Sequence, residues 1–140
     1  SAIAMAKKNA QLNGAVMNFV TADVFEYLPA QIEAHADYDF IILDPPAFTK
    51  SRRTYHNARE GYRKINAQAM RLLPRGGILA TCSCSHFMPT EEFRSMLNEA
   101  GREAGVRIRV IEERHASPDH PVLLGVPETD YLKFFLVQVV

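Results

Sequence analysis

The fold is decided by the stretch Asp-Phe-Ile-Ile-Leu-Asp at residues 39–44, which Pro45 and Pro46 follow at once. Four consecutive apolar residues between two acidic ones indicate a strand that is buried on both faces, as in a parallel sheet. Proline has no backbone N–H to donate to a neighbouring strand, so two prolines in a row end the strand at Asp44. A buried strand that stops at a rigid turn is typical of an α/β fold in which ligands bind at the carboxyl ends of the strands.

The segments around this strand alternate between strand and helix patterns. Short runs rich in β-branched or aromatic residues predict further strands, and apolar residues three and four positions apart predict helices. Strands are expected at residues 16–20, 78–82, 106–111 and 131–140, and helices at residues 1–14, 25–28, 56–73 and 90–104, the last with Thr90 as its N-cap. This alternation favours a parallel α/β sheet, and the last two strands, which no helix pattern joins, are expected to form an antiparallel hairpin at its edge.

Composition restricts the class of protein. The 140 residues are 47% hydrophobic and 23% charged, which suits one globular domain with a single core. Sixteen basic residues balance sixteen acidic ones, so any attraction to nucleic acid must be local. Cys82 and Cys84 are too close in sequence for a structural disulfide, which indicates a reducing, cytoplasmic location. No apolar run approaches the length of a membrane span, and the histidines and cysteines do not have the spacing of a metal site.

Five motifs follow one another along almost the whole chain: Asp44-Pro45-Pro46-Ala47-Phe48, Gly61-Tyr62-Arg63-Lys64-Ile65-Asn66, Gly76-Gly77 with Ser83-Cys84-Ser85, Asp119-His120-Pro121-Val122, and Tyr131-Leu132-Lys133. Each motif is weak alone, but in this order the set resembles bacterial ribosomal RNA cytosine-5 methyltransferases, in which a PUA domain is joined to a Rossmann-like catalytic domain. The resemblance implies a class I methyltransferase sheet, S-adenosylmethionine as the cofactor, and the 23S RNA of the large ribosomal subunit as the partner.

Cys84 is the candidate nucleophile. Cytosine C5 is too weak a nucleophile to accept a methyl group directly, whereas a thiolate that adds to C6 turns C5 into a reactive enamine carbon. The resemblance aligns Cys84 with the catalytic cysteine of the family, and its place after a predicted strand, next to His86, gives access and a proton acceptor. Cys82, inside that strand, fits the alternative of a small buried hydrophobic side chain. Ala47 stands where some relatives carry a second cysteine, so the group that removes the C5 proton is not identified.

Asp44 and Asp23 are the candidate acidic residues at strand ends. The two prolines after Asp44 hold its carboxylate and the nearby carbonyl groups in a fixed place, as recognition of a planar base requires. The alternative is a solvated residue in a turn. The resemblance implies that Asp44 and Pro45 lie at the cofactor and the base, and that Asp23 contacts the adenine ring. For Asp23 the alternative is an Asx turn or a helix N-cap.

Residues 50–64 are locally basic, with six positive residues against one negative. Lys50, Arg52 and Arg53 come just beyond the candidate site, where contacts to phosphates would position RNA without reading its sequence. A basic run on a helix is more often a solvated face, so the expectation of RNA contact rests on residues 50–53 more than on the helix that follows.

The chain lacks two features that a complete enzyme of this kind needs. Its seven glycines form no G-x-G turn, and it opens in the helix that the resemblance places after the second strand. Residues 1–140 are therefore expected to be the C-terminal portion of one methyltransferase domain, truncated and inactive alone. The exposed edge of strand 40–43 is expected to pair with residues 16–20 or with a second copy in a homodimer.

Two other interpretations stay open. One is an N-methyltransferase of the same fold that uses Asp44 and the two prolines after it, although Ala47 replaces the aromatic residue that stacks on the base in such enzymes. The other is a non-catalytic fragment that binds RNA or associates with a partner through residues 50–64.

Overall fold

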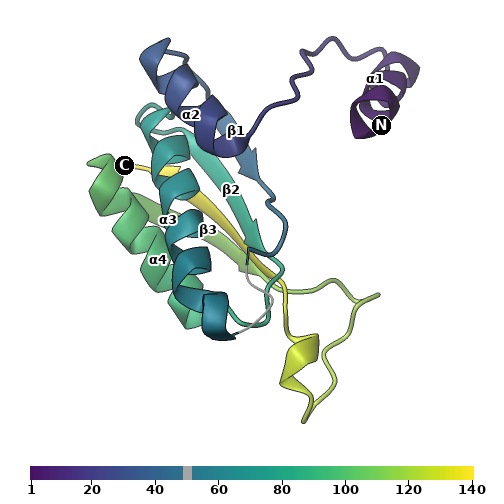
Figure 1. Cartoon of the computed structure of the whole chain (residues 1–140), viewed down its shortest axis with the longest axis vertical. Coiled ribbons are helices and arrows are strands. Elements are labelled where there is room, and N and C mark those ends of the chain that lie inside the picture. Colours follow the sequence, from purple (N-terminus) through teal and green to yellow (C-terminus); the bar gives the residue numbers. More distant parts are fainter. Residues whose placement is uncertain (49–51) are drawn as a thin grey trace.

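The computed structural model describes residues 1–48 and 52–140 and contains a four-stranded sheet of order β1-β2-β4-β3. The strands are β1 (Phe40–Leu43), β2 (Ile78–Ser83), β3 (Ile108–Arg114) and β4 (Lys133–Val139). β1 and β2 are parallel, whereas β4 runs antiparallel to both β2 and β3 (Figure 1). The predicted α/β class and the antiparallel pairing of the last two strands are thereby confirmed.

Helices cover one face of this sheet. α3 (Tyr55–Arg71) and α4 (Thr90–Ala104) lie side by side across it, and α2 (Val24–Glu33) packs against α3 near β1 (Figure 1). The apolar face predicted for the helix at 56–73 is buried at each of its positions: Ala58, Tyr62, Ile65, Ala69 and Leu72. Four of them, Tyr62, Ile65, Ala69 and Leu72, form one core with Phe93 and Met96 of α4 and with Leu79, Phe135 and Val137 of the sheet. Helical periodicity therefore identified the main packing surface correctly.

Two helix boundaries differ from the expectation. α4 begins with Pro89 at the N-cap position instead of Thr90, and no side chain caps its first turn, although Glu91 and Glu92 lie favourably at its positive end. α2 continues through Pro29 to Glu33, because one missing backbone donor costs a single hydrogen bond that packing against α3 offsets.

Residues 16–20 do not form the expected strand, and their expected pairing with β1 is wrong. Val16 and Val20 are exposed in an extended segment that joins α1 (Ala2–Leu12) to Asp23 without a ladder of hydrogen bonds. β-branched residues favour extended backbone, but a strand forms only where a neighbour accepts its hydrogen bonds. Pairing of β1 with a second copy stays a prediction.

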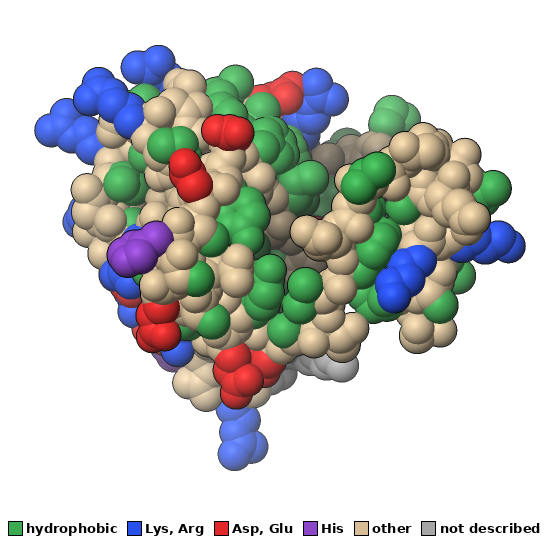
Figure 2. All heavy atoms as spheres, turned by 90° about the horizontal axis from the view of Figure 1, so that it is seen from above, with side chains coloured by type: hydrophobic (Ala, Val, Ile, Leu, Met, Phe, Trp, Pro, Cys, Tyr) green, Lys and Arg blue, Asp and Glu red, His purple; other side chains and the backbone are tan. Residues whose placement is uncertain are grey.

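The face of the sheet opposite the helices is bare along β1, so the expected burial of this strand on both faces is wrong for the described chain. Ile42 is 67% exposed and Phe40 is 51% exposed, whereas Leu43 is buried. Figure 2 shows hydrophobic side chains gathered on the part of the main body that faces the separate lobe formed by α1. Exposed apolar surface of this kind usually marks a surface that another segment or molecule covers.

None of the helices described is long and apolar enough to cross a membrane.

Candidate functional site

The candidate site lies where β1 and β2 end and β4 begins. Leu43 is in register with Thr81, which places Asp44 beside Cys82, and Ser83 is in register with Lys133. The charges of Asp44 and Cys84 both influence the Cys82 thiol. The two predicted catalytic residues, Asp44 and Cys84, therefore share one edge of the sheet, as expected for the carboxyl ends of neighbouring parallel strands.

The loop from Asp44 to Phe48 is anchored on α3. The ring of Phe48 contacts the ring of Tyr62 at a centroid distance of 4.6 Å and that of Phe25 at 5.8 Å, in tilted arrangements. A Cβ atom on Gly61 would come within 3.3 Å of the Phe48 ring, so glycine at this position makes the close contact with α3 feasible. The aromatic residue that ends this motif thus fixes the loop that begins at Asp44.

Tyr62 connects this loop to the cysteine turn, a role that its place on a predicted buried helix face did not reveal. Its side chain is fully buried, and its hydroxyl oxygen accepts a hydrogen bond of 3.5 Å from the Phe48 N–H. Burial raises the pKa of Tyr62 above its usual value, while hydrogen bonds with Ser83 and Phe48 oppose this rise. In the sequence, the only indication of the contact between Tyr62 and Phe48 is that Gly61 precedes Tyr62 in the same motif.

The two cysteines have different surroundings, although both are free thiols that are partly exposed. Cys82 alternates along β2 with the buried Thr81 and Ser83, so its side chain lies on the face away from the helices. Burial, helped by the negative charge of Asp44, raises the pKa of Cys82 to about 11. A thiol with so high a pKa is a poor nucleophile near neutral pH, which favours Cys84, just past the end of the strand, as the reactive cysteine.

Lys133, which the sequence patterns left without a role, lies buried at the same edge. Its side chain is 1% exposed, and its ammonium group donates hydrogen bonds to the backbone carbonyl oxygens of Ser85 and Tyr131. No carboxylate among the described residues lies within ion-pair distance of it. Burial lowers the pKa of Lys133 to about 8, while Asp130 and Cys84 oppose this effect.

A pocket of about 260 Å³ opens beside the cysteine turn. Its lining comes from the segment after Cys84 and from the short 3-10 helix at Pro127–Thr129: His86, Phe87, Pro89, Pro127 and Glu128. The rings of His86 and Phe87 are tilted against each other, with centroids 3.8 Å apart. Aromatic and polar side chains thus line this pocket, which begins two residues after Cys84.

Asp23 acts as the N-cap of α2, the alternative that its sequence position had left open. Its carboxylate accepts a hydrogen bond of 2.8 Å from the Phe25 N–H. No hydrogen bond or ion pair among the described residues joins Asp23 to Asp44. The structure thus brings Asp44, Pro45 and Cys84 to one edge but does not link Asp23 to them.

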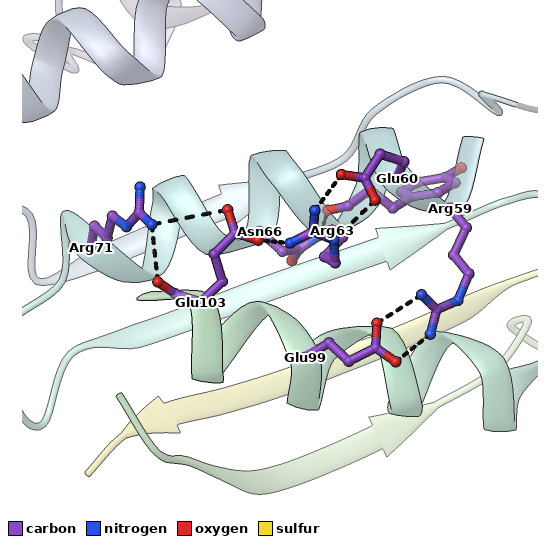
Figure 3. A network of polar contacts seen from close by, with 8 residues as sticks. Arg59, Glu60, Arg63, Asn66, Arg71, Glu99 and Glu103 are labelled. Carbon is purple, nitrogen blue, oxygen red and sulfur yellow. Dashed lines mark hydrogen bonds and ion pairs between the residues drawn. The ribbon is translucent and has the colours of Figure 1, made fainter. Parts of the chain in front are cut away.

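Arginines of α3 form ion pairs with glutamates of α4 (Figure 3). Arg59 forms a bidentate pair with Glu99 at 2.7 and 2.8 Å, and Arg63 pairs with Glu60 and Glu103. These arginines hold the two helices together and are not left free for phosphates. Of the predicted RNA-binding residues, Lys50 lies outside the described residues, Arg52 belongs to the 3-10 helix at Arg52–Thr54, and Arg53 is exposed.

We expect Arg59→Ala to lower the free energy of unfolding by about 1 kcal/mol at pH 7, because Glu99 loses its bidentate partner. Arg59 holds the pKa of Glu99 below its usual value. The pair therefore stabilises the fold fully above the unfolded-state pKa of glutamate, and the contribution is lost as the pH falls through the lowered pKa. Urea denaturation at pH 7 and pH 3 measures this difference.

Arg102→Ala on the exposed face of α4 is the matched control and should change the stability by only a few tenths of a kcal/mol. An equal loss for Arg59→Ala at both pH values would contradict the role given to this pair.

The sequence of the chain is similar to that of known ribosomal RNA methyltransferases. No protein-family model matches the chain. Over 99% of its length, the chain is 39% identical to Ribosomal RNA large subunit methyltransferase I of Serratia proteamaculans. It spans 36% of that relative, about a third, and corresponds to its C-terminal part. The predicted resemblance to ribosomal RNA methyltransferases of the large subunit is confirmed.

Solved structures share the fold. A protein assigned as a methyltransferase and complexed with SAH has a TM-score of 0.81 at 22% identity, over 97% of this chain and 36% of that one. A protein from Streptococcus mutans, assigned as a SAM-dependent methyltransferase, also has a TM-score of 0.81, at 23% identity over 97% of this chain and 35% of that one. At these identities the likeness shows the fold alone, which is the predicted class I methyltransferase sheet.

Proposed function

We propose that this chain is the C-terminal portion of the catalytic domain of an S-adenosylmethionine-dependent methyltransferase that forms 5-methylcytosine in large-subunit ribosomal RNA. The observation that carries this proposal is the meeting of Asp44 and Cys84 at one sheet edge, with Cys82 disfavoured as a thiolate. The ribosomal RNA methyltransferase relatives support RNA as the substrate. Because the chain spans about a third of them, the proposal concerns the enzyme that carries this chain.

The residues at this edge fit the chemistry of the proposed cofactor. Asp44 presents an exposed carboxylate, and the carbonyl groups of the two prolines after it add acceptors, which suits the ammonium group of a methionine moiety. Asp44 and Pro45 would hold this part of the cofactor, and Asp23 its adenine ring. S-adenosylmethionine, when bound, supplies the methyl group, and SAH occupies one of the structures with the same fold.

The proposed reaction proceeds through a covalent bond between Cys84 and the base. The Cys84 sulfur forms a bond to C6, and the electron pair of the C5–C6 double bond makes C5 nucleophilic enough to accept the methyl group. A base then removes the C5 proton, the electron pair of that C–H bond restores the double bond, and the C6–S bond breaks to release the thiolate. His86, exposed two residues after Cys84, supplies a proton acceptor at this edge.

Nucleoside analysis of the product tests this proposal. The enzyme that carries this chain, given S-adenosylmethionine and large-subunit ribosomal RNA, should produce 5-methylcytidine. Formation of N4-methylcytidine or N6-methyladenosine would instead favour amine methylation by the same fold. RNA binding without any methylated nucleoside would favour a non-catalytic role.

We propose that residues 50–53 contact RNA phosphates. Replacing Lys50, Arg52 and Arg53 together by Ala should weaken RNA binding for all sequences alike. The slope of log Kd against log salt should fall by about one for each phosphate that the variant no longer binds. Filter binding at several salt concentrations measures both quantities.

Three arginines at the opposite end of the sheet provide a control that removes the same charge. Arg102, Arg107 and Arg109 are exposed around the start of β3, away from the candidate site. Their joint replacement by Ala should leave the slope nearly unchanged. Equal effects of the two triple variants would show that net charge, and not the position of residues 50–53, accounts for binding.

A further inference from the structure

Lys133 is a buried cation that has no ion pair with a carboxylate among the described residues. A fully buried lysine usually has a carboxylate partner, because burial penalises the charged form. Here the two partners of Lys133 are carbonyl oxygens, those of Ser85 and Tyr131, which satisfy two of its three N–H donors. A cation whose burial is unfavourable therefore lies at the edge of the sheet that carries the proposed nucleophile.

Lys133 contacts the residues on both sides of Cys84. Its backbone is in register with Ser83, the residue before the cysteine, and its side chain bonds to the carbonyl of Ser85, the residue after it. The further bond to Tyr131 ties the same ammonium group to the segment that leads into β4. This geometry fixes the turn around Cys84 against the first residue of β4.

The charges of Lys133 and Cys84 influence each other. A Cys84 thiolate raises the pKa of Lys133, against the larger lowering by burial. The hydrogen bond to the Ser85 carbonyl places the positive charge of Lys133 one residue from Cys84, in the same turn. Besides His86 in the same turn, the titratable groups that face this region are Asp130 before β4, Tyr62 on α3, Cys82 on β2 and Asp44 after β1.

We propose that Lys133 is a positioning residue for Cys84, which holds the cysteine turn through Ser85 and supplies the positive charge that stabilises its thiolate. The inference rests on the proposed function only for the target of this thiolate, which is C6 of a cytosine. It adds a residue that touches neither the base nor the cofactor and acts through the nucleophile.

The rate of alkylation of Cys84 by iodoacetamide tests this inference without any methylation assay. A Cys82→Ser background leaves Cys84 as the only thiol of the chain. At pH 7 we expect Lys133→Met to slow the alkylation of Cys84 about tenfold. The pH profile of the alkylation rate should move about one unit higher, because a nearby positive charge favours deprotonation of a thiol by about that amount. Lys133→Arg, which keeps the charge, should stay within about threefold of the parent.

Lys8→Met on α1 removes the same charge from an exposed position and should leave the rate unchanged. An unchanged rate and profile for Lys133→Met would overturn the inference. Faster alkylation together with a loss of the circular dichroism signal would show only that this variant unfolds, so a second measurement leaves Lys133 in place.

This second measurement is the titration of Lys133 by NMR in protein with labelled lysine side chains, before and after Cys84 is blocked with methyl methanethiosulfonate. The Lys133 signal is assigned by its loss in Lys133→Arg. Blocking the thiol should lower the pKa of Lys133 by about half a unit or more, because the neighbouring negative charge is gone. An identical titration before and after blocking would overturn the inference, whether or not the enzyme methylates cytosine.

Discussion

Replacing Cys84 by Ala is expected to abolish RNA methylation by the enzyme that carries this chain, with kcat lowered by about a thousandfold or more. The reason is that the thiolate is the group that makes C5 of cytosine reactive. The affinity for S-adenosylmethionine should change little, because the thiol acts on the base and not on the cofactor. Methyl incorporation into RNA and calorimetric titration of the cofactor measure the two effects separately.

Cys82→Ala is the matched control two residues away. Cys82 has a pKa of about 11 and lies within β2, with its side chain on the face away from the helices. This variant should keep most of the activity. If Cys82→Ala were inactive and Cys84→Ala active, the assignment of the nucleophile would be wrong.

Asp44→Asn is expected to lower the methylation rate about a hundredfold, the usual loss when one preorganised electrostatic contact is removed. The prolines that follow and the anchoring of Phe48 on α3 hold this carboxylate in place, so an amide of the same size keeps the shape and removes the charge. We also expect the pKa of Cys82 to fall, because the charge of Asp44 helps to raise it. Methylation kinetics and alkylation of Cys82 measure the two results.

Asp39→Asn controls for the loss of one acidic side chain at the other end of the same strand. Asp39 is exposed just before β1, on the edge of the sheet opposite the site. Its replacement should leave both the methylation rate and the Cys82 pKa unchanged. A similar loss of activity in both variants would contradict the role proposed for Asp44.

Local patterns predicted the parts of the fold that depend on local packing. The spacing of Tyr62, Ile65 and Ala69 identified the buried face of α3, and the apolar run before Pro45 identified β1. One expectation that failed concerns residues 16–20, whose composition favours a strand. Strand formation depends on a hydrogen-bonding neighbour, and composition carries no information about that neighbour.

The candidate site was predictable to a similar extent. Strand ends and motif order pointed to Asp44 and Cys84, which the structure places at one edge. The contacts of Tyr62 with Phe48 and of Lys133 with Ser85 join residues that lie far apart in sequence, so local patterns did not indicate them. The pairing of Arg59 with Glu99 likewise depends on how α3 meets α4, so the charge pattern of the helix alone indicated a free basic face.

The most direct test of the central claim is a covalent trap. RNA that carries 5-fluorocytidine at the target position is incubated with the enzyme and S-adenosylmethionine, and the protein–RNA adduct is digested and sequenced by mass spectrometry. Fluorine at C5 cannot leave as a proton does, so the adduct with the nucleophile persists after methyl transfer. We predict an adduct that depends on the cofactor and maps to Cys84. Methylation of unmodified RNA without any such adduct, or an adduct at Cys82, would contradict the account.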